Sequence, residues 1–208
     1  MQVPENTMAS FEEALKLGVD GFETDVRLSS DGVLILFHDR VAPDGRAVGS
    51  IPHKELNRLM GFEVPTLEAA VSTWQDAFWN IEIKAPEALD STISVVRRYR
   101  EETQFLISSF WHPVVVACCR TTGVEGGLLI AHRPLEMTAL LETIRLQTGV
   151  NTLVWDYETA DPELLQLAAS NGARNFVYGA LTRAEHQRLR ALEVDCVITD
   201  RPEFVTTI

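Results

Sequence analysis

The 208-residue chain has few cysteines, a shortage of positive charge and no long apolar run. Its cysteines are the adjacent pair Cys118 and Cys119 and the remote Cys196, a pattern that fits neither a disulfide framework nor a Cys-x-x-Cys metal site. Since all three lie among apolar residues, we expect them to be buried and unreactive. No apolar run approaches the roughly 18 residues of a membrane-spanning helix, and no signal peptide is visible. These absences predict a cytoplasmic protein without membrane insertion.

Negative charge dominates the composition. Lysine and arginine number 18 and aspartate and glutamate 30, which gives a formal net charge of −12. A surface with this charge repels nucleic acid and anionic membranes. A small anionic substrate would therefore need a local cation or a metal ion. With 46% hydrophobic and 23% charged residues, the bulk of the chain is not expected to be disordered.

Short apolar runs of strand length alternate with segments that carry helix signals. Thr66, Asp161-Pro162 and the Thr182–Glu185 capping box each precede a helical apolar pattern. Several of the runs are apolar on both faces, as strands of a parallel sheet are. The predicted strands are 22–28, 33–37, 79–83, 105–109, 127–131, 152–155, 175–178 and 196–199. This alternation favours an α/β fold with right-handed crossovers.

From residue 81 onward the strands recur every 20 to 24 residues, which is the even spacing of a (β/α)₈ TIM barrel. If 33–37 forms a hairpin with the strand at 22–28, seven barrel strands remain. The helix predicted over 6–17 then has no strand before it. We expect a single barrel domain over 1–208, without its first strand and with a small insertion at about 40–62.

Ionisable residues alternate within two of the predicted strands. Glu23 and Asp25 are two residues apart and therefore project from the same face, as do Glu82 and Lys84. Three carboxylates at the carboxyl ends of barrel strands would form an oxygen site suited to Mg²⁺ or Ca²⁺. The residues alone are equally compatible with a buried salt-bridge network around Lys84.

His38 follows the predicted strand 33–37 and precedes Asp39. A lone histidine at a strand end is usually structural, but beside a metal cluster it becomes a candidate general acid or base. His53 and His186 lie in polar segments and are expected to be solvated, and His112 begins a helix.

A series of short motifs resembles the glycerophosphodiester phosphodiesterase family over essentially the whole chain. The motifs occur in that family's order: Pro4-Glu5-Asn6-Thr7, Gly21-Phe22-Glu23-Thr24-Asp25-Val26, Ser30-Asp31-Gly32, His38-Asp39, Pro65-Thr66-Leu67-Glu68, Ile81-Glu82-Ile83-Lys84, Ser108-Ser109-Phe110 and Val194–Glu203. The resemblance implies a (β/α)₈ barrel that hydrolyses glycerophosphodiesters to an alcohol and glycerol 3-phosphate with a divalent metal.

The resemblance also implies roles for single residues. Glu23, Asp25 and Glu82 would be the metal ligands, Lys84 would contact the phosphate, and His38 would be one of two acid/base histidines. These roles suit the chemistry, since a cation offsets phosphate charge and a histidine protonates a leaving alkoxide.

The chain departs from the family in lacking the His-Arg-Gly motif that would precede Pro4, which would supply the other histidine and a phosphate-binding arginine. We expect an in-frame His-Arg-Gly upstream of Met1 if the chain is an enzyme. His132-Arg133 is a less favoured substitute. The alternatives are a non-catalytic metal- and phosphate-binding barrel and a metal-dependent barrel enzyme that acts on a phosphorylated sugar.

Overall fold

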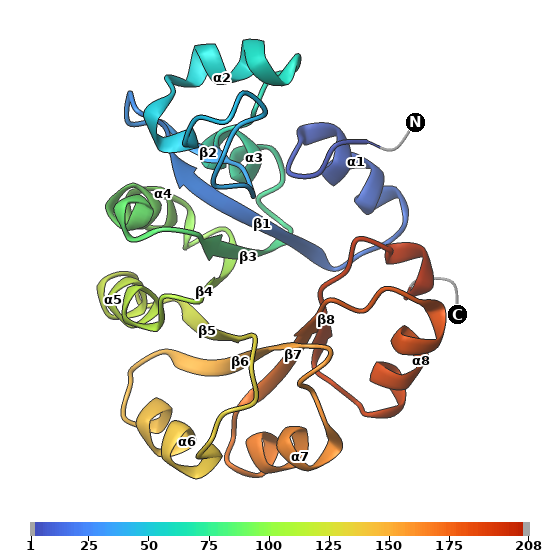
Figure 1. Cartoon of the computed structure of the whole chain (residues 1–208). Helices are drawn as coiled ribbons and strands as arrows, with labels where there is room; N and C mark the ends of the chain where they lie inside the picture. The colour runs from blue at the N-terminus through green and yellow to red at the C-terminus, as the bar shows by residue number, and fades with distance from the viewer. Residues whose placement is uncertain (1–2, 206–208) are drawn as a thin grey trace. The chain divides into compact units, whose positions relative to one another are not determined.

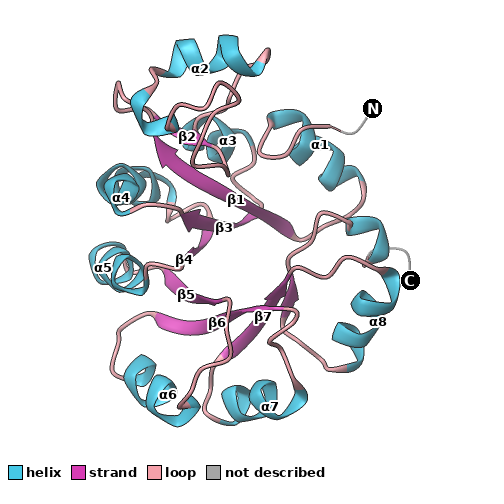
Figure 2. Cartoon of the chain, in the orientation of Figure 1, coloured by secondary structure: helices cyan, strands magenta, loops and turns pink. Residues whose placement is uncertain are grey.

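The computed structural model describes residues 3–205, which belong to two compact units that meet in sequence between Ile107 and Ser108. None of the described helices is long and apolar enough to cross a lipid bilayer. Each unit contains both helices and strands (Figures 1 and 2), and the alternation is regular only in the second.

The first unit contains the less regular half of the chain. Its elements are α1 (Met8–Lys16), β1 (Gly21–Leu28), β2 (Leu34–Leu36), the 3₁₀ turn η1 (Val48–Ser50), α2 (His53–Met60), α3 (Leu67–Thr73), β3 (Phe78–Ile83), the 3₁₀ turn η2 (Pro86–Ala88) and α4 (Leu89–Tyr99). Strand β4 (Gln104–Ser109) crosses the boundary between the units. β1 is the longest of these strands and pairs in parallel with β3 and antiparallel with β2. The hairpin predicted for 33–37 is therefore confirmed.

Aromatic packing attaches α1 to the strands of the first unit. Phe11 on α1 contacts Phe22, Trp74 and Trp79, with ring centroids 4.9, 5.8 and 5.3 Å apart. Offset and edge-on ring pairs of this kind add to the free energy gained by burial. At the start of β1, a Cβ on Gly21 would collide with the carbonyl oxygen of Phe78, so glycine permits β1 and β3 to approach. This packing holds α1 against the start of β1.

The segment predicted as a small insertion, 40–62, has its own apolar core. Val48, Ile51 and Leu56 are fully buried and pack with Ile35 of β2. An isolated bridge between Val41 and Ala47 closes the turn that precedes η1. The segment is thus a packed substructure whose apolar side chains contact β2.

The second unit repeats one β/α pattern. Its elements are α5 (His112–Thr122), β5 (Glu125–Ile130), α6 (Met137–Arg145), β6 (Val150–Asp156), α7 (Pro162–Ser170), β7 (Arg174–Tyr178), α8 (Arg183–Ala191), β8 (Cys196–Val197) and the 3₁₀ turn η3 (Pro202–Phe204). Strands β5 to β8 pair in parallel with their neighbours, and α6 to α8 lie along the same side of them (Figure 2). Leu153 and Trp155 of β6 are fully buried in the core between these layers.

Local capping explains where the helices begin. Asp161 accepts a hydrogen bond from the backbone N–H of Leu164, and Thr182 forms a capping box with Glu185. Thr66 caps α3 in the same way. These predicted helix starts are confirmed, and the predicted strands are confirmed to within two residues at either end. Within residues 3–205, α1 is the first element, as expected from the strand count.

The cysteines generate the first prediction. Cys118 and Cys119 on α5 are buried, and burial raises the pKa of their thiols to about 11 and about 12. Cys196 is half-buried, so the prediction that all three are buried is confirmed only for the pair. At pH 8 the native chain should react rapidly with a thiol reagent at no more than one cysteine, because the pair is shielded and almost entirely protonated. Quantitative labelling with and without denaturant measures this, and three fast-reacting thiols in the native chain would contradict it.

Candidate functional site

Three carboxylates converge between β1 and β3. In the parallel register Asp25 lies opposite Glu82, and Glu23 lies opposite Asn80. Because alternate residues of a strand share a face, the side chains of Glu23, Asp25 and Glu82 project together. One carboxylate oxygen from each lies within 4.8 Å of the others. The structure therefore brings together the three residues singled out from the sequence as an oxygen cluster.

Lys84 supplies positive charge at this cluster. Its Nζ lies 2.8 Å from Glu82 Oε1 and 3.2 Å from Asp25 Oδ1, and its side chain is only 14% exposed. Burial alone would lower the pKa of Lys84, but attraction by Asp25 and Glu82 outweighs it and raises that pKa. The ammonium group is therefore charged at neutral pH and shared between two buried carboxylates.

Glu82 is not fully compensated by Lys84. Burial of Glu82, assisted by repulsion from Asp25, raises its pKa despite the ion pair. Because the pKa of Glu82 is higher in the folded chain than in the unfolded chain, its contribution to the free energy of unfolding is fully present below the unfolded pKa. That contribution is lost as the pH rises through the folded pKa. A cation bound between the carboxylates would favour the charged form of Glu82 and so offset the cost of its burial.

The residues present fit a hard divalent cation. All three donors are carboxylate oxygens, the ligands that Mg²⁺ and Ca²⁺ prefer. Two oxygens on opposite sides of a Ca²⁺ ion lie about 5 Å apart, and those around Mg²⁺ lie about 4 Å apart. The spacing of up to 4.8 Å among these oxygens accommodates one such ion.

Asn6 contacts this cluster from the turn before α1. Its Nδ2 donates to Asp25 Oδ2 at 2.9 Å, and its Oδ1 accepts from the backbone N–H of Asp25 at 3.2 Å. Sequence reasoning assigned Asn6 no role. The sequence offered one signal for such a role, since Asn6 belongs to the motif Pro4–Thr7. Residue spacing alone, however, does not predict that this turn lies beside Asp25.

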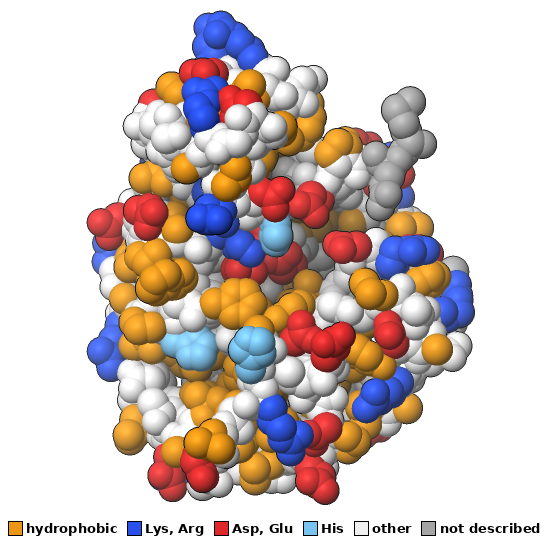
Figure 3. Space-filling model, in the orientation of Figure 1, with side chains coloured by type: hydrophobic (Ala, Val, Ile, Leu, Met, Phe, Trp, Pro, Cys, Tyr) orange, Lys and Arg blue, Asp and Glu red, His pale blue; other side chains and the backbone are white. Residues whose placement is uncertain are grey.

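His38 lies at the exposed edge of the same region. Its ring is 52% exposed, and Nδ1 lies 3.0 Å from Asp39 Oδ1. The backbone places it beside β1, since the N–H of Phe37 donates to the carbonyl of Asp25 and Arg27 donates through Nε and Nη2 to the carbonyl of His38. The charge of protonated His38 acts to lower the pKa of Glu82, so the two groups are electrostatically coupled. Acidic and basic side chains intermingle on the visible face of this unit (Figure 3).

Two histidines expected to be solvated have structural partners instead. His186 is only 4% exposed, with Nδ1 bonded to the carbonyl of Thr182 and Nε2 to the hydroxyl of Thr199. The expectation was wrong because His186 occupies the inward side of α8, although its neighbours in sequence are polar. His53 is half-buried, and its Nε2 lies 2.7 Å from the carbonyl of Val64.

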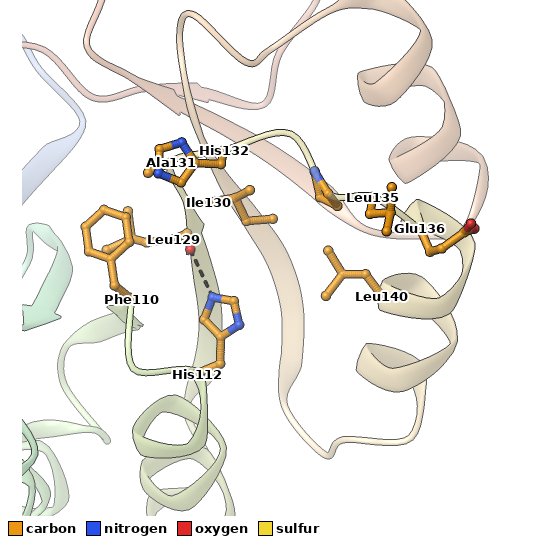
Figure 4. A pocket seen from close by; sticks show the side chains of 10 residues that line it. Phe110, His112, Leu129, Ile130, Ala131, His132, Leu135, Glu136 and Leu140 are labelled. Carbon is orange, nitrogen blue, oxygen red and sulfur yellow. Dashed lines mark hydrogen bonds between the residues drawn. The ribbon is translucent and has the colours of Figure 1, made fainter.

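In the second unit, His112 and His132 line an open, mainly apolar pocket with Phe110, Leu135 and Leu140 (Figure 4). His112 begins α5, as predicted, and its Nε2 bonds to the carbonyl of Leu129 at 2.9 Å. Next to His132, Arg133 forms an ion pair with Asp161 at the start of α7. The charge of Arg133 is thus already partnered, which weakens the case for His132-Arg133 as a substitute for the missing motif.

Comparison with solved structures defines the class of fold. A glycerophosphodiester phosphodiesterase from Thermotoga maritima matches 99% of this chain and 92% of its own, with a TM-score of 0.86 and 25% sequence identity. The chain therefore has the predicted (β/α)₈-barrel fold.

Comparison with curated sequences identifies the family. The sequence model described as "Glycerophosphoryl diester phosphodiesterase family" matches residues 1–204. A glycerophosphodiester phosphodiesterase from Caldanaerobacter subterraneus is 29% identical over 99% of this chain and 92% of its own length. The "Probable glycerophosphodiester phosphodiesterase 2" of Mycobacterium tuberculosis is 36% identical over 52% of this chain and 44% of its own. The chain belongs to the glycerophosphoryl diester phosphodiesterase family.

The ion pairs of Lys84 generate the second prediction. Lys84→Met should lower the free energy of unfolding by about 3–5 kcal/mol in the absence of divalent ions, because it leaves two buried carboxylates unpaired. Millimolar Ca²⁺ or Mg²⁺ should restore part of that loss. Urea unfolding measures both effects.

Lys16→Met is the matched control for this experiment, since Lys16 also contacts two carboxylates, Glu12 and Glu13, but on the exposed surface of α1. Exposed ion pairs contribute little to stability, so this variant should unfold nearly as the wild type does. Equal effects of the two substitutions would mean that the Lys84 network is not buried as described.

Proposed function

We propose that this chain hydrolyses glycerophosphodiesters to an alcohol and glycerol 3-phosphate, with a divalent cation held by Glu23, Asp25 and Glu82. The observation that carries the proposal is the meeting of these three carboxylates beside Lys84, in a chain of this family. The names of its relatives support this substrate class.

When bound, Mg²⁺ or Ca²⁺ would supply Lewis-acid stabilisation of the negative charge on the phosphodiester. The carboxylates hold that cation, and burial of Asp25 and Glu82 keeps water from weakening their hold on it. In this proposal Lys84 donates to a phosphate oxygen, exchanging part of its present contact with Glu82 for one with substrate.

We assign the proton-transfer role to His38. Its half-exposed ring can reach a substrate that enters from solvent, whereas His186 and His53 bond to protein groups. Asp39 contacts Nδ1 and favours the proton there, which leaves Nε2 to exchange a proton with substrate. In the protonated ring Nε2 also carries a proton, which the leaving alkoxide would take, so that the ring becomes neutral and keeps its remaining proton on Nδ1.

Metal binding by the cluster is tested with Glu82→Gln. Replacing this carboxylate with an amide should weaken Ca²⁺ or Mg²⁺ binding at least about tenfold while the fold persists, because one anionic ligand is lost. Titration calorimetry on both proteins measures the affinity. The control is Glu12→Gln, which alters an exposed carboxylate of the same unit. Equal affinity in wild type and Glu82→Gln would favour a purely structural salt-bridge network.

The role of His38 is tested with His38→Ala. Turnover of glycerophosphocholine should fall by about two to four orders of magnitude, the usual contribution of a positioned proton-transfer group. Melting temperature should barely change, because the ring is half-exposed.

His53→Ala is the matched control, because the His53 ring makes a hydrogen bond with the backbone carbonyl of Val64. Its loss should lower the melting temperature more than it lowers turnover. A His38→Ala protein with normal turnover and a large loss of melting temperature would show that His38 is structural.

Binding and turnover assays with other ligands distinguish the two alternative hypotheses for the site. Binding of cation and glycerol 3-phosphate without turnover would identify a non-catalytic barrel. Turnover of a phosphorylated sugar in preference to glycerophosphodiesters would identify a different substrate class.

A further inference from the structure

Both oxygens of the Asp25 carboxylate have a fixed partner. Lys84 Nζ lies 3.2 Å from Oδ1, and Asn6 Nδ2 donates to Oδ2 at 2.9 Å. Asp25 is 5% exposed, so water contributes little to its orientation. The lysine and the amide therefore determine how this carboxylate is turned within the cluster.

The amide of Asn6 is itself held at its other end. Oδ1 accepts from the hydroxyl of Thr24 at 2.5 Å and from the backbone N–H of Asp25 at 3.2 Å. Since Oδ1 faces two donors and Nδ2 faces a carboxylate, the orientation of the amide follows from its partners. Asn6 Oδ1 therefore accepts hydrogen bonds from two consecutive residues of β1, Thr24 and Asp25, while Nδ2 donates to the Asp25 carboxylate.

The backbone at Asn6 has a conformation that most residues avoid. Its φ is 54°, in the left-handed region that asparagine tolerates better than other side chains with a Cβ. Thr7 follows as the cap of α1, and its hydroxyl donates to the carbonyl of Pro4. This tight turn is what directs the Asn6 side chain to β1. Strained backbone of this kind concentrates at functional sites.

We propose that Asn6 is a positioning residue of the cation site, which orients the Asp25 carboxylate so that Oδ1 faces Glu82 and the cation. This inference rests on the proposed function. Side chains that orient metal ligands typically change metal affinity by about 10- to 100-fold when they are lost.

The test is Asn6→Gly, which keeps the left-handed backbone without strain and removes the amide. Titration calorimetry with Ca²⁺ should show affinity weakened by about 10- to 100-fold at unchanged stoichiometry. The Ca²⁺ concentration that gives half-maximal turnover should rise in proportion, while turnover at saturating Ca²⁺ stays close to that of the wild type.

Glu193→Gly is the matched control, because Glu193 has a similar left-handed φ of 51° and is exposed at the end of α8. It relieves the same kind of backbone strain without touching Asp25, so its Ca²⁺ affinity should equal that of the wild type. A loss of affinity shared by both glycine variants would overturn the proposal in favour of a general effect of backbone freedom.

A second variant covers the case in which Asn6→Gly does not fold. Thr24→Val keeps the size of a fully buried side chain but removes the hydroxyl that anchors Asn6, and it should weaken Ca²⁺ binding several-fold. Wild-type affinity in Asn6→Gly would overturn the positioning role, provided that Glu82→Gln still weakens binding. If Asn6→Gly does not fold, wild-type affinity in Thr24→Val would do the same. A wild-type chain that binds no cation would instead overturn the proposed function together with this inference.

Discussion

The packing of β1 against β3 must accommodate a buried concentration of negative charge, which Lys84 offsets by direct ion pairs and Arg27 by longer-range attraction. Asp25 and Glu82 are both nearly inaccessible to water and share the ammonium group of Lys84. Charges buried in this way are costly unless they are paired and hydrogen-bonded. Burial, together with repulsion from Asp25, raises the pKa of Glu82 despite the attraction of Lys84. A site built like this is poised for a cation, since an added positive charge relieves an existing cost.

The surrounding fold keeps these groups in place. The parallel register of β1 and β3 sets Asp25 opposite Glu82, and the missing side chain of Gly21 lets the two strands approach at their start. Phe11 anchors α1 through an aromatic cluster. That anchorage brings the turn before α1, and with it Asn6, to Asp25. The docking of α1 is thus coupled to the orientation of the Asp25 carboxylate.

Periodicity and capping made most of the architecture predictable. Local signals such as Asp161-Pro162 and Thr182–Glu185 place helix starts because the hydrogen bonds that satisfy a helix end are made by neighbours in sequence. The alternation of Glu23 with Asp25 likewise predicts a shared face without any knowledge of the partner strand. His186 shows where this reasoning fails. Its polar neighbours indicated solvent, but the orientation of α8 turned the ring inward to Thr199.

By itself, the sequence determined the alternation of strands and helices, the barrel class and the carboxylates that share a strand face, because each depends on periodic spacing along the chain. Only the tertiary structure decided that Glu82 lies opposite Asp25, that Lys84 bridges them and that Asn6 holds the second oxygen of Asp25. These contacts join residues far apart in sequence. Their geometry follows from sheet register and from the docking of α1, which arise when the apolar faces of different elements pack together.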